Sequence, residues 1–376
     1  MPTTNHYIGL MSGTSLDGID AALVDFSNSS CRLVHATSRE LPAQLRAELL
    51  ALTQPGDNEI ERLGRTDITF ARLQADLVRQ LLTAADIPHS AVAAIGSHGQ
   101  TIRHRPCQDP AFTIQLGDPN CLAELSGIDV VADFRRRDIA AGGQGAPLVP
   151  AFHAQCFRST SIDRAILNLG GVANITLLPK APTDVVSGFD TGPANVLMDA
   201  WSQRHLNQPF DRNGSWAERG RIVPELLQRL LSEGYFIEPA PKSTGRELFH
   251  IGWVDHHLDQ LETIPEPQDV QATLLELTAT SVAAELRRHP LPIKELYLCG
   301  GGAHNLALVK RLSHHLPQLR IASTERLGLH PDWVEAIAFA WLAKRFVDRQ
   351  PGNLPAVTGA SGPRILGTLS PAGLNH

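Results

Sequence analysis

The segment that most constrains the fold lies near the N-terminus, where two apolar runs flank a short polar turn. The runs are Tyr7–Met11 and Ile19–Phe26, and Ser12–Gly18 lies between them. Because Gly13 and Gly18 can adopt backbone angles closed to other residues, the segment predicts two strands joined by a tight turn. The turn carries three hydroxyl side chains: Ser12, Thr14 and Ser15. Its N–H groups and hydroxyls can converge on one anion, so it predicts a phosphate site or, alternatively, a plain hairpin.

Two further glycine turns follow in the second half of the chain. Arg164–Leu178 repeats the pattern of two apolar runs, here around Gly170 and Gly171. Glu295–Asn305 predicts a strand that enters a turn of three glycines, Gly300 to Gly302, before a helix. One such turn is weak support for a nucleotide site, but three in this order favour one.

Size and composition describe a globular chain without a nucleic-acid surface. Its 376 residues favour two domains, and the net charge of -6 argues against a nucleic-acid partner. The five cysteines are scattered and form no CxxC pair, so they suggest neither a disulfide framework nor a zinc site. We find no signal peptide and no apolar run near the roughly 20 residues of a membrane span. These features predict a cytoplasmic protein that binds no membrane.

The domain boundary is expected in Ala140–Pro150, which is rich in Gly, Pro and Ala. We therefore predict an N-terminal lobe at 1–145, to which the tail at about 359–376 returns, and a C-terminal lobe at 146–358. The region 211–267 is rich in proline and charge and gives no clear assignment.

Polar residues follow two predicted buried strands. Ser97, His98 and Gln100 come after Ala91–Gly96, and Arg135 comes after Ile128–Ala132. The carboxyl ends of strands are where open α/β sheets bind ligands, so these residues are substrate-binding candidates. A structural histidine and a solvated arginine are the alternatives.

The order of the glycine turns resembles the superfamily of sugar kinases, actin and heat-shock chaperones. Four motifs resemble one family within it, the anhydro-N-acetylmuramic acid kinases: Gly9–Asp20, Ser97–Ile102, Ala141–Pro150 and Phe189–Asn195. The resemblance runs from about Tyr7 to Thr368. It implies an α/β fold with two ribonuclease-H-like domains, each with a mixed five-stranded sheet and flanking helices, and an actin/hexokinase-type cleft.

The resemblance also implies the activity. Members hydrolytically open the 1,6-anhydro ring of anhydro-N-acetylmuramic acid and phosphorylate O6 with ATP and Mg²⁺. The products are N-acetylmuramic acid 6-phosphate and ADP, within peptidoglycan recycling. The implied partners are this small-molecule substrate and a second copy of the chain.

Asp190 and Glu335 are the catalytic candidates. Asp190 matches the family's catalytic aspartate in Asp-Thr-Gly-Pro, and its alternative is to cap the following helix. Glu335 lies early in an apolar helix, and in the family the matching helix lies near the sugar and the nucleotide. The alternative role for Glu335 is that of a first-turn glutamate that the helix dipole favours.

The nucleotide candidates are the residues of the three turns: Gly13, Thr14, Ser15, Leu16, Asp17, Gly18, Ile19, Asp20, Gly170, Gly171, Gly300, Gly301 and Gly302. Asp17 is also the metal candidate. Many sugar kinases place a metal-binding aspartate two residues before the hairpin glycine, where this chain has Met11, so the metal assignment depends on Asp17.

Two rivals remain. One is an ordinary sugar or carboxylate kinase that phosphorylates a free hydroxyl. The other is a non-catalytic nucleotide-binding protein of the same fold. An ATP-independent glycosidase is disfavoured, because it leaves the glycine turns without a role.

Overall fold

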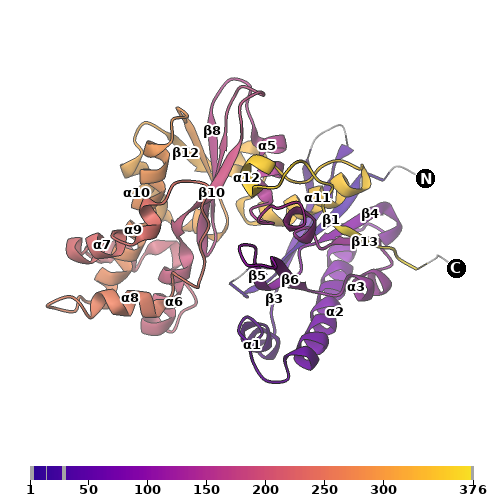
Figure 1. Cartoon of the computed structure of the whole chain (residues 1–376), viewed down its shortest axis with the longest axis horizontal. Coiled ribbons are helices and arrows are strands. Elements are labelled where there is room, and N and C mark those ends of the chain that lie inside the picture. Colours follow the sequence, from indigo (N-terminus) through magenta and orange to yellow (C-terminus); the bar gives the residue numbers. More distant parts are fainter. Residues whose placement is uncertain (1–3, 14, 28–30, 374–376) are drawn as a thin grey trace. The chain divides into compact units, whose positions relative to one another are not determined.

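The computed structural model describes residues 4–13, 15–27 and 31–373. It divides into two compact units, Met1–Cys156 with Trp333–His376, and Phe157–Asp332 (Figure 1). The lobes expected from the sequence stay a prediction. The units differ from those lobes in placing helix α11 (Val334–Val347) in the first unit, because α11 packs on strands of the first sheet.

The first unit is built on a mixed six-stranded sheet in the order β13-β7-β4-β1-β2-β3. These strands are β1 (His6–Met11), β2 (Gly18–Asp25), β3 (Arg32–Glu40), β4 (Val92–Ser97), β7 (Val130–Ala132) and β13 (Thr368–Ser370). β1 pairs antiparallel with β2 and parallel with β4, and Met11 lies opposite Asp20. This register confirms the predicted hairpin. A separate two-stranded sheet joins β5 (Gln100–Arg105) to β6 (Phe112–Leu116).

The second unit has a mixed five-stranded sheet in the order β10-β9-β8-β11-β12. The strands are β8 (Arg164–Leu169), β9 (Val172–Leu178), β10 (Ser187–Pro193), β11 (Glu295–Cys299) and β12 (Arg320–Ser323). β8, β9 and β10 are antiparallel neighbours, and β11 is parallel to both β8 and β12.

Both units share one topology. Three antiparallel strands come first, and two later strands are then added on the side of the first strand, each parallel to its neighbour. β7-β4-β1-β2-β3 and β12-β11-β8-β9-β10 are the same order. The α/β fold with mixed five-stranded sheets is therefore confirmed as the common core. The first sheet has six strands rather than five, because β13 adds to it by pairing antiparallel with β7.

The helices of the first unit cover both faces of its sheet (Figure 1). They are α1 (Ala43–Ala51), α2 (Glu59–Ala85), α3 (Pro119–Ser126), α4 (Arg136–Ile139), α5 (Val149–Phe157, whose last residue belongs to the second unit), α11 and α12 (Pro355–Thr358), with the 3-10 turn η2 (His89–Ala91). Ile8 and Leu10 join the core formed with α2. Gly9 lies between them and faces α11, as alternation along a strand requires.

Glycine allows α11 to approach the first sheet closely. A Cβ on Gly9 would lie 1.8 Å from the carbonyl oxygen of Ala336, and one on Gly96 would lie 2.0 Å from that of Phe339. Both distances are far below any van der Waals contact, so only glycine fits at either position.

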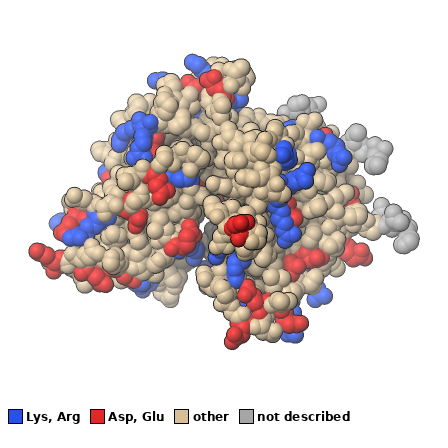
Figure 2. All heavy atoms as spheres, viewed as in Figure 1, with Lys and Arg blue, Asp and Glu red and all other residues tan. Residues whose placement is uncertain are grey.

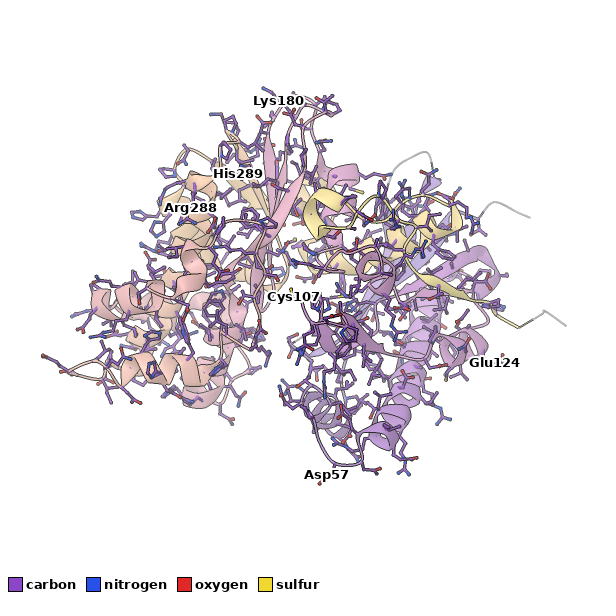
Figure 3. The ribbon with its side chains drawn as sticks, in the orientation of Figure 1. Asp57, Cys107, Glu124, Lys180, Arg288 and His289 are labelled. Atoms are coloured by element: carbon purple, nitrogen blue, oxygen red, sulfur yellow. The ribbon has the colours of Figure 1, made fainter. Side chains whose placement is uncertain are left out.

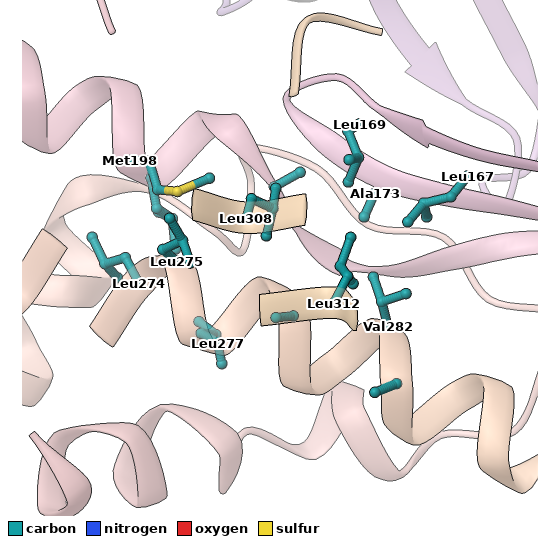
Figure 4. Close-up of a cluster of buried hydrophobic side chains, with 14 of the residues drawn as sticks. Leu167, Leu169, Ala173, Met198, Leu274, Leu275, Leu277, Val282, Leu308 and Leu312 are labelled. Carbon is teal, nitrogen blue, oxygen red and sulfur yellow. The ribbon is translucent and has the colours of Figure 1, made fainter. Parts of the chain in front are cut away.

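Helices and short 3-10 turns connect the strands of the second sheet. They are α6 (Asn195–Leu206), α7 (Pro224–Leu231), α8 (Ile251–Leu258), α9 (Pro267–Arg288) and α10 (Leu306–His315), with η3 (Arg212–Gly214), η4 (Ala217–Arg219), η5 (Gly234–Ile237), η6 (Gly301–His304), η7 (Thr324–Leu327) and η8 (Pro331–Trp333, whose last residue belongs to the first unit). α9 is buried along most of its length, and Leu274 and Val282 on it pack in one core with Leu167 of β8 and Leu312 of α10 (Figure 4).

The surface carries both signs of charge. On the face drawn in Figure 2, Lys and Arg are interspersed with Asp and Glu and form no continuous basic patch. None of the helices in the described part of the chain is long and apolar enough to cross a bilayer.

Candidate functional site

The turn between β1 and β2 is held by its own hydroxyl and by an unexpected backbone angle. Ser12 Oγ lies 2.8 Å from Gly18 O and 2.7 Å from Gln100 Oε1, and it donates its one hydrogen to either. Among the described residues of the turn, Leu16 is left-handed, with φ of 58°, and Gly13 and Gly18 are not. Gly18 is required for a different reason: a Cβ there would lie 2.6 Å from Arg39 O.

The residues predicted for this turn divide by exposure. The side chains of Leu16 and Ile19 are buried in the core, so only their backbone can meet a ligand. Asp17 is largely exposed, with 75% of its side chain accessible and Arg46 at 3.8 Å. Thr14 lies outside the described residues. The turn thus presents backbone groups, Ser15 and Asp17.

His98 joins this turn to Arg135. Its Nδ1–H donates to Ser12 O at 3.1 Å, and its Nε2 accepts from Arg135 Nη2 at 2.7 Å. Burial, and then the Arg135 charge, lower the pKa of His98 to about 3, so the ring is neutral and its tautomer is fixed. Both ring nitrogens of His98 thus have hydrogen-bond partners within the protein.

Glu335 and Arg135 were separate candidates in the sequence, and the fold of the first unit brings their charges together. Burial lowers the pKa of Arg135 to about 10, while the negative charges of Glu335 and Asp138 raise it. The guanidinium therefore stays charged near neutral pH. Arg135 Nη1 also donates to Gly145 O at 2.8 Å. The fourth substrate candidate, Ser97, is buried and accepts from Gln74 Nε2.

Asp138 is a residue that the sequence analysis missed. Its buried carboxylate accepts from Gly145 N at 2.8 Å, Asn353 Nδ2 at 2.7 Å and Thr358 Oγ1 at 2.8 Å. These bonds join the glycine-rich loop, which the sequence suggested as a linker, to the segment near α12. The signal available in the sequence was an aspartate close to a run of glycines. A Cβ on Gly143 would lie 2.3 Å from Asp138 Oδ2, so glycine leaves room for this carboxylate.

Asp190 lies within β10. Asn174 Nδ2 donates to its Oδ1 at 2.8 Å, and Thr244 N donates to its Oδ2 at 3.0 Å. Burial raises the pKa of Asp190 to about 6, although these two hydrogen bonds oppose the shift. The capping alternative is wrong, because α6 begins at Asn195 and its N-cap residue is Ala194.

The two glycine turns of the second unit meet at the start of α6. The carbonyl groups of Gly170 and Gly171 accept from the first backbone N–H groups there, with Asn195 N at 3.0 Å from Gly170 O. Gly300 has φ of 76°, and a Cβ on Gly302 would lie 3.0 Å from Asn195 Oδ1. The fold thus brings Gly170, Gly171 and the three-glycine turn together around Asn195.

The described residues 4–13, 15–27 and 31–373 contain no group of three His, Cys, Asp or Glu side chains placed to hold a metal ion. A Mg²⁺ ion that is bound mainly through nucleotide phosphates needs only one or two carboxylates. The exposed Asp17 fits such a role, whereas a dedicated protein cage does not fit this set of residues.

Comparisons with known proteins give one family. The family model described as anhydro-N-acetylmuramic acid kinase matches residues 5–372. A protein of that name from Shewanella pealeana is 52% identical over 368 residues, which cover 98% of this chain and 99% of the relative. Those from Saccharophagus degradans and Acinetobacter baylyi are each 50% identical, covering 96% and 97% of this chain and 98% of each relative.

Solved structures match this chain at much lower sequence identity. A glucokinase of the ROK family from Streptomyces griseus, in complex with glucose and AMPPNP, is 13% identical with a TM-score of 0.41, covering 90% of this chain and 99% of that one. The activator of the 2-hydroxyisocaproyl-CoA dehydratase from Clostridium difficile, with bound ADPNP, is 10% identical with a TM-score of 0.47, covering 92% and 96%.

Proposed function

Because the chain belongs to the anhydro-N-acetylmuramic acid kinase family, we propose that it opens 1,6-anhydro-N-acetylmuramic acid with water and phosphorylates O6. The observation that carries this proposal is identity at about half of all positions over nearly the whole length of several relatives of that name. One sugar, one water and one ATP give N-acetylmuramic acid 6-phosphate and ADP. The reaction belongs to peptidoglycan recycling.

Asp190 is the proposed general base. A base must be ionised to accept a proton, and a pKa close to the working pH gives it the strongest pull on water. The pKa of about 6 meets both needs near neutral pH. The carboxylate takes one proton of the water while the water oxygen bonds to the anomeric carbon. The bond from that carbon to O6 breaks with its electron pair on O6, which then accepts the γ-phosphoryl group.

Arg135 is the proposed partner of the substrate's lactyl carboxylate, since a guanidinium binds a carboxylate in two-pronged geometry. His98 and Gly145 fix its orientation through hydrogen bonds of 2.7 and 2.8 Å. Glu335, whose negative charge raises the pKa of Arg135, is proposed to assist the sugar chemistry. Ser97 and Gln100 are proposed to support the sugar from the same unit.

ATP is proposed to bind at the three glycine turns. In the second unit these are Gly170 with Gly171, and Gly300 to Gly302, which meet around Asn195. In the first unit the turn from Gly13 to Asp20 offers backbone groups, and Asp17 is the proposed ligand of Mg²⁺. The ion, when bound, would neutralise charge on the phosphates.

The test is product analysis with the purified chain, ATP, Mg²⁺ and the anhydro sugar. We expect a product heavier than the substrate by one water and one phosphoryl group, with early samples in heavy-oxygen water carrying label at the anomeric carbon. A product that gains only the phosphoryl group would indicate the ordinary sugar kinase. No phosphorylated sugar at all would contradict both kinase proposals.

Three further properties belong to this proposal. We place the enzyme in the cytoplasm, where ATP is available, and propose a homodimer, as the family resemblance implies. Light scattering after size exclusion tests the dimer, and a monomer at micromolar concentration would refute it. The proposed lobes are those expected from the sequence.

A further inference from the structure

Thr244 has a buried hydroxyl that the protein does not satisfy. Its backbone N–H donates to Asp190 Oδ2 at 3.0 Å, so the residue lies directly beside the proposed base. Within residues 4–13, 15–27 and 31–373, no group forms a hydrogen bond with Thr244 Oγ1, although the atom is shielded from solvent. A buried polar atom without a partner opposes folding, which calls for an explanation such as a bound ligand.

The neighbouring Thr191 provides a comparison. Thr191 follows Asp190 in the chain and is fully buried, yet its hydroxyl donates to Ala173 O at 3.3 Å. A buried threonine here can therefore be satisfied internally. The hydroxyl of Thr244, unlike that of Thr191, has no partner among the described residues.

The segment that carries Thr244 is fixed against β10. Asp190 N donates to Lys242 O at 3.0 Å, and Tyr235 Oη donates to Asp190 O at 2.7 Å. These contacts, with the bond from Thr244 N, connect the segment to both the backbone and the carboxylate of Asp190.

A buried ion pair holds the other side of the same segment. Lys242 Nζ donates to Glu285 Oε1 at 2.9 Å, and their side chains are only 3% and 7% exposed. Arg288, labelled in Figure 3 near the end of α9, also donates to Glu285 Oε1. A buried charge that loses its partner is strongly unfavourable, so this pair keeps the segment in place. The backbone of Thr244 is therefore held in place beside Asp190.

The spacing suits one water molecule. Oγ1 of a threonine is about 3 Å from its own N atom, so Thr244 Oγ1 lies within roughly 6 Å of Asp190 Oδ2. A water that donates one hydrogen to each of two oxygens spans about 4.5 Å between them, because its two hydrogen bonds diverge near the tetrahedral angle, and this span lies within that limit. The carboxylate has room for that water, because an ionised carboxylate accepts about four hydrogen bonds and two come from Asn174 and Thr244.

We propose that Thr244 Oγ1 and Asp190 together hold the water that attacks the anomeric carbon; this inference rests on the proposed function. The water gives one hydrogen to the carboxylate and directs the other at Thr244 Oγ1. Its lone pair then points away from both groups, toward the sugar. As the bond to the anomeric carbon forms, the proton moves to Asp190 and the bond to O6 breaks with its electrons on O6.

The experiment compares three full-length variants with the wild type. Thr244→Val removes the hydroxyl and keeps the shape, Thr244→Ser keeps the hydroxyl, and Ser243→Ala removes an exposed hydroxyl one residue away. Steady-state kinetics are measured with the anhydro sugar, and thermal unfolding is followed in parallel.

We expect Thr244→Val to lower kcat by roughly 10- to 100-fold, as misplacement of a reacting group does, with KM for sugar and ATP unchanged. Thr244→Ser should stay within about threefold of the wild type. Ser243→Ala should have the kcat of the wild type. Should Thr244→Val not fold, a loss of kcat in Thr244→Ala that Thr244→Ser does not share would support the proposal equally.

Three outcomes would overturn it. They are wild-type kcat in Thr244→Val, loss of activity in Thr244→Ser equal to that in Thr244→Val, and a raised KM for the sugar at constant kcat, which would indicate a substrate contact instead. Each leaves the proposed function intact. Failure of the wild type and Ser243→Ala to make phosphorylated muramic acid would refute the proposed function itself.

Discussion

Arg135 Nη2 donates to His98 Nε2 over 2.7 Å, and the other ring nitrogen of His98 donates to the backbone of the first hairpin turn. The guanidinium is thereby fixed relative to Ser12 although 123 positions separate the two residues (135 minus 12). A residue that follows one strand is joined in this way to the turn that follows another.

Arg135→Lys tests the use of that fixed guanidinium. Lysine keeps the charge but loses the planar fork, so KM for the anhydro sugar should rise by about 10- to 100-fold, and KM for ATP should not change. Steady-state kinetics with each substrate varied measure both constants. Arg137→Lys, at an exposed position two residues away, is the matched control. Equal KM values for Arg135→Lys and the wild type would exclude Arg135 from sugar binding.

Asp190 should set the acidic limb of the pH profile. Its pKa of about 6 lies above the ordinary value, and the base acts when ionised, so kcat should fall about tenfold per pH unit below that pKa and level off above it. A stopped assay from pH 5 to 8 records the limb. Asp190→Asn should lose at least about 100-fold in kcat while ATP binding, followed by calorimetry, is retained. A variant that keeps wild-type turnover would rule out this base.

Asp138→Asn should destabilise the first unit. One amide oxygen can replace only part of the carboxylate, and the amide NH₂ would face a donor, either Gly145 N or the side chains of Asn353 and Thr358. A buried donor without its acceptor costs about 1–3 kcal/mol. Urea denaturation measures this loss in free energy of unfolding. Asp57→Asn, at the exposed position labelled in Figure 3, should change it by less than about 0.5 kcal/mol. Similar stability of both variants would show that the Asp138 network contributes little.

Gly9→Ala and Gly64→Ala should change stability in opposite directions. The added Cβ at Gly9 would overlap the backbone of α11 and should cost about 3 kcal/mol or more. Gly64 lies in α2 with nothing within 4 Å of a new Cβ, so alanine there should stabilise by about 0.5–1 kcal/mol. Thermal unfolding of both variants is the measurement. If Gly9→Ala unfolds no earlier than the wild type, α11 does not pack on β1 as described.

Local pattern accounts for much of the fold. The apolar runs around Ser12–Gly18 form β1 and β2, and those around Gly170 form β8 and β9, because alternation and turn-forming residues act over a few positions. The segment 211–267 resisted assignment, because its short helices depend for their stability on packing against other helices: α7 contacts α8 and α9, and α8 also contacts α6.

The sequence by itself determined the family, the two glycine-bounded hairpins and the identity of the candidate carboxylates, since each depends on residues adjacent in the chain. Only the tertiary structure decided that Asp190 has a raised pKa, that Asp138 and Arg135 converge on Gly145, and that Thr244 stands beside Asp190. Burial and hydrogen bonds between distant segments set these properties. No stretch of neighbouring residues encodes how deeply a carboxylate is buried, or which distant N–H reaches it.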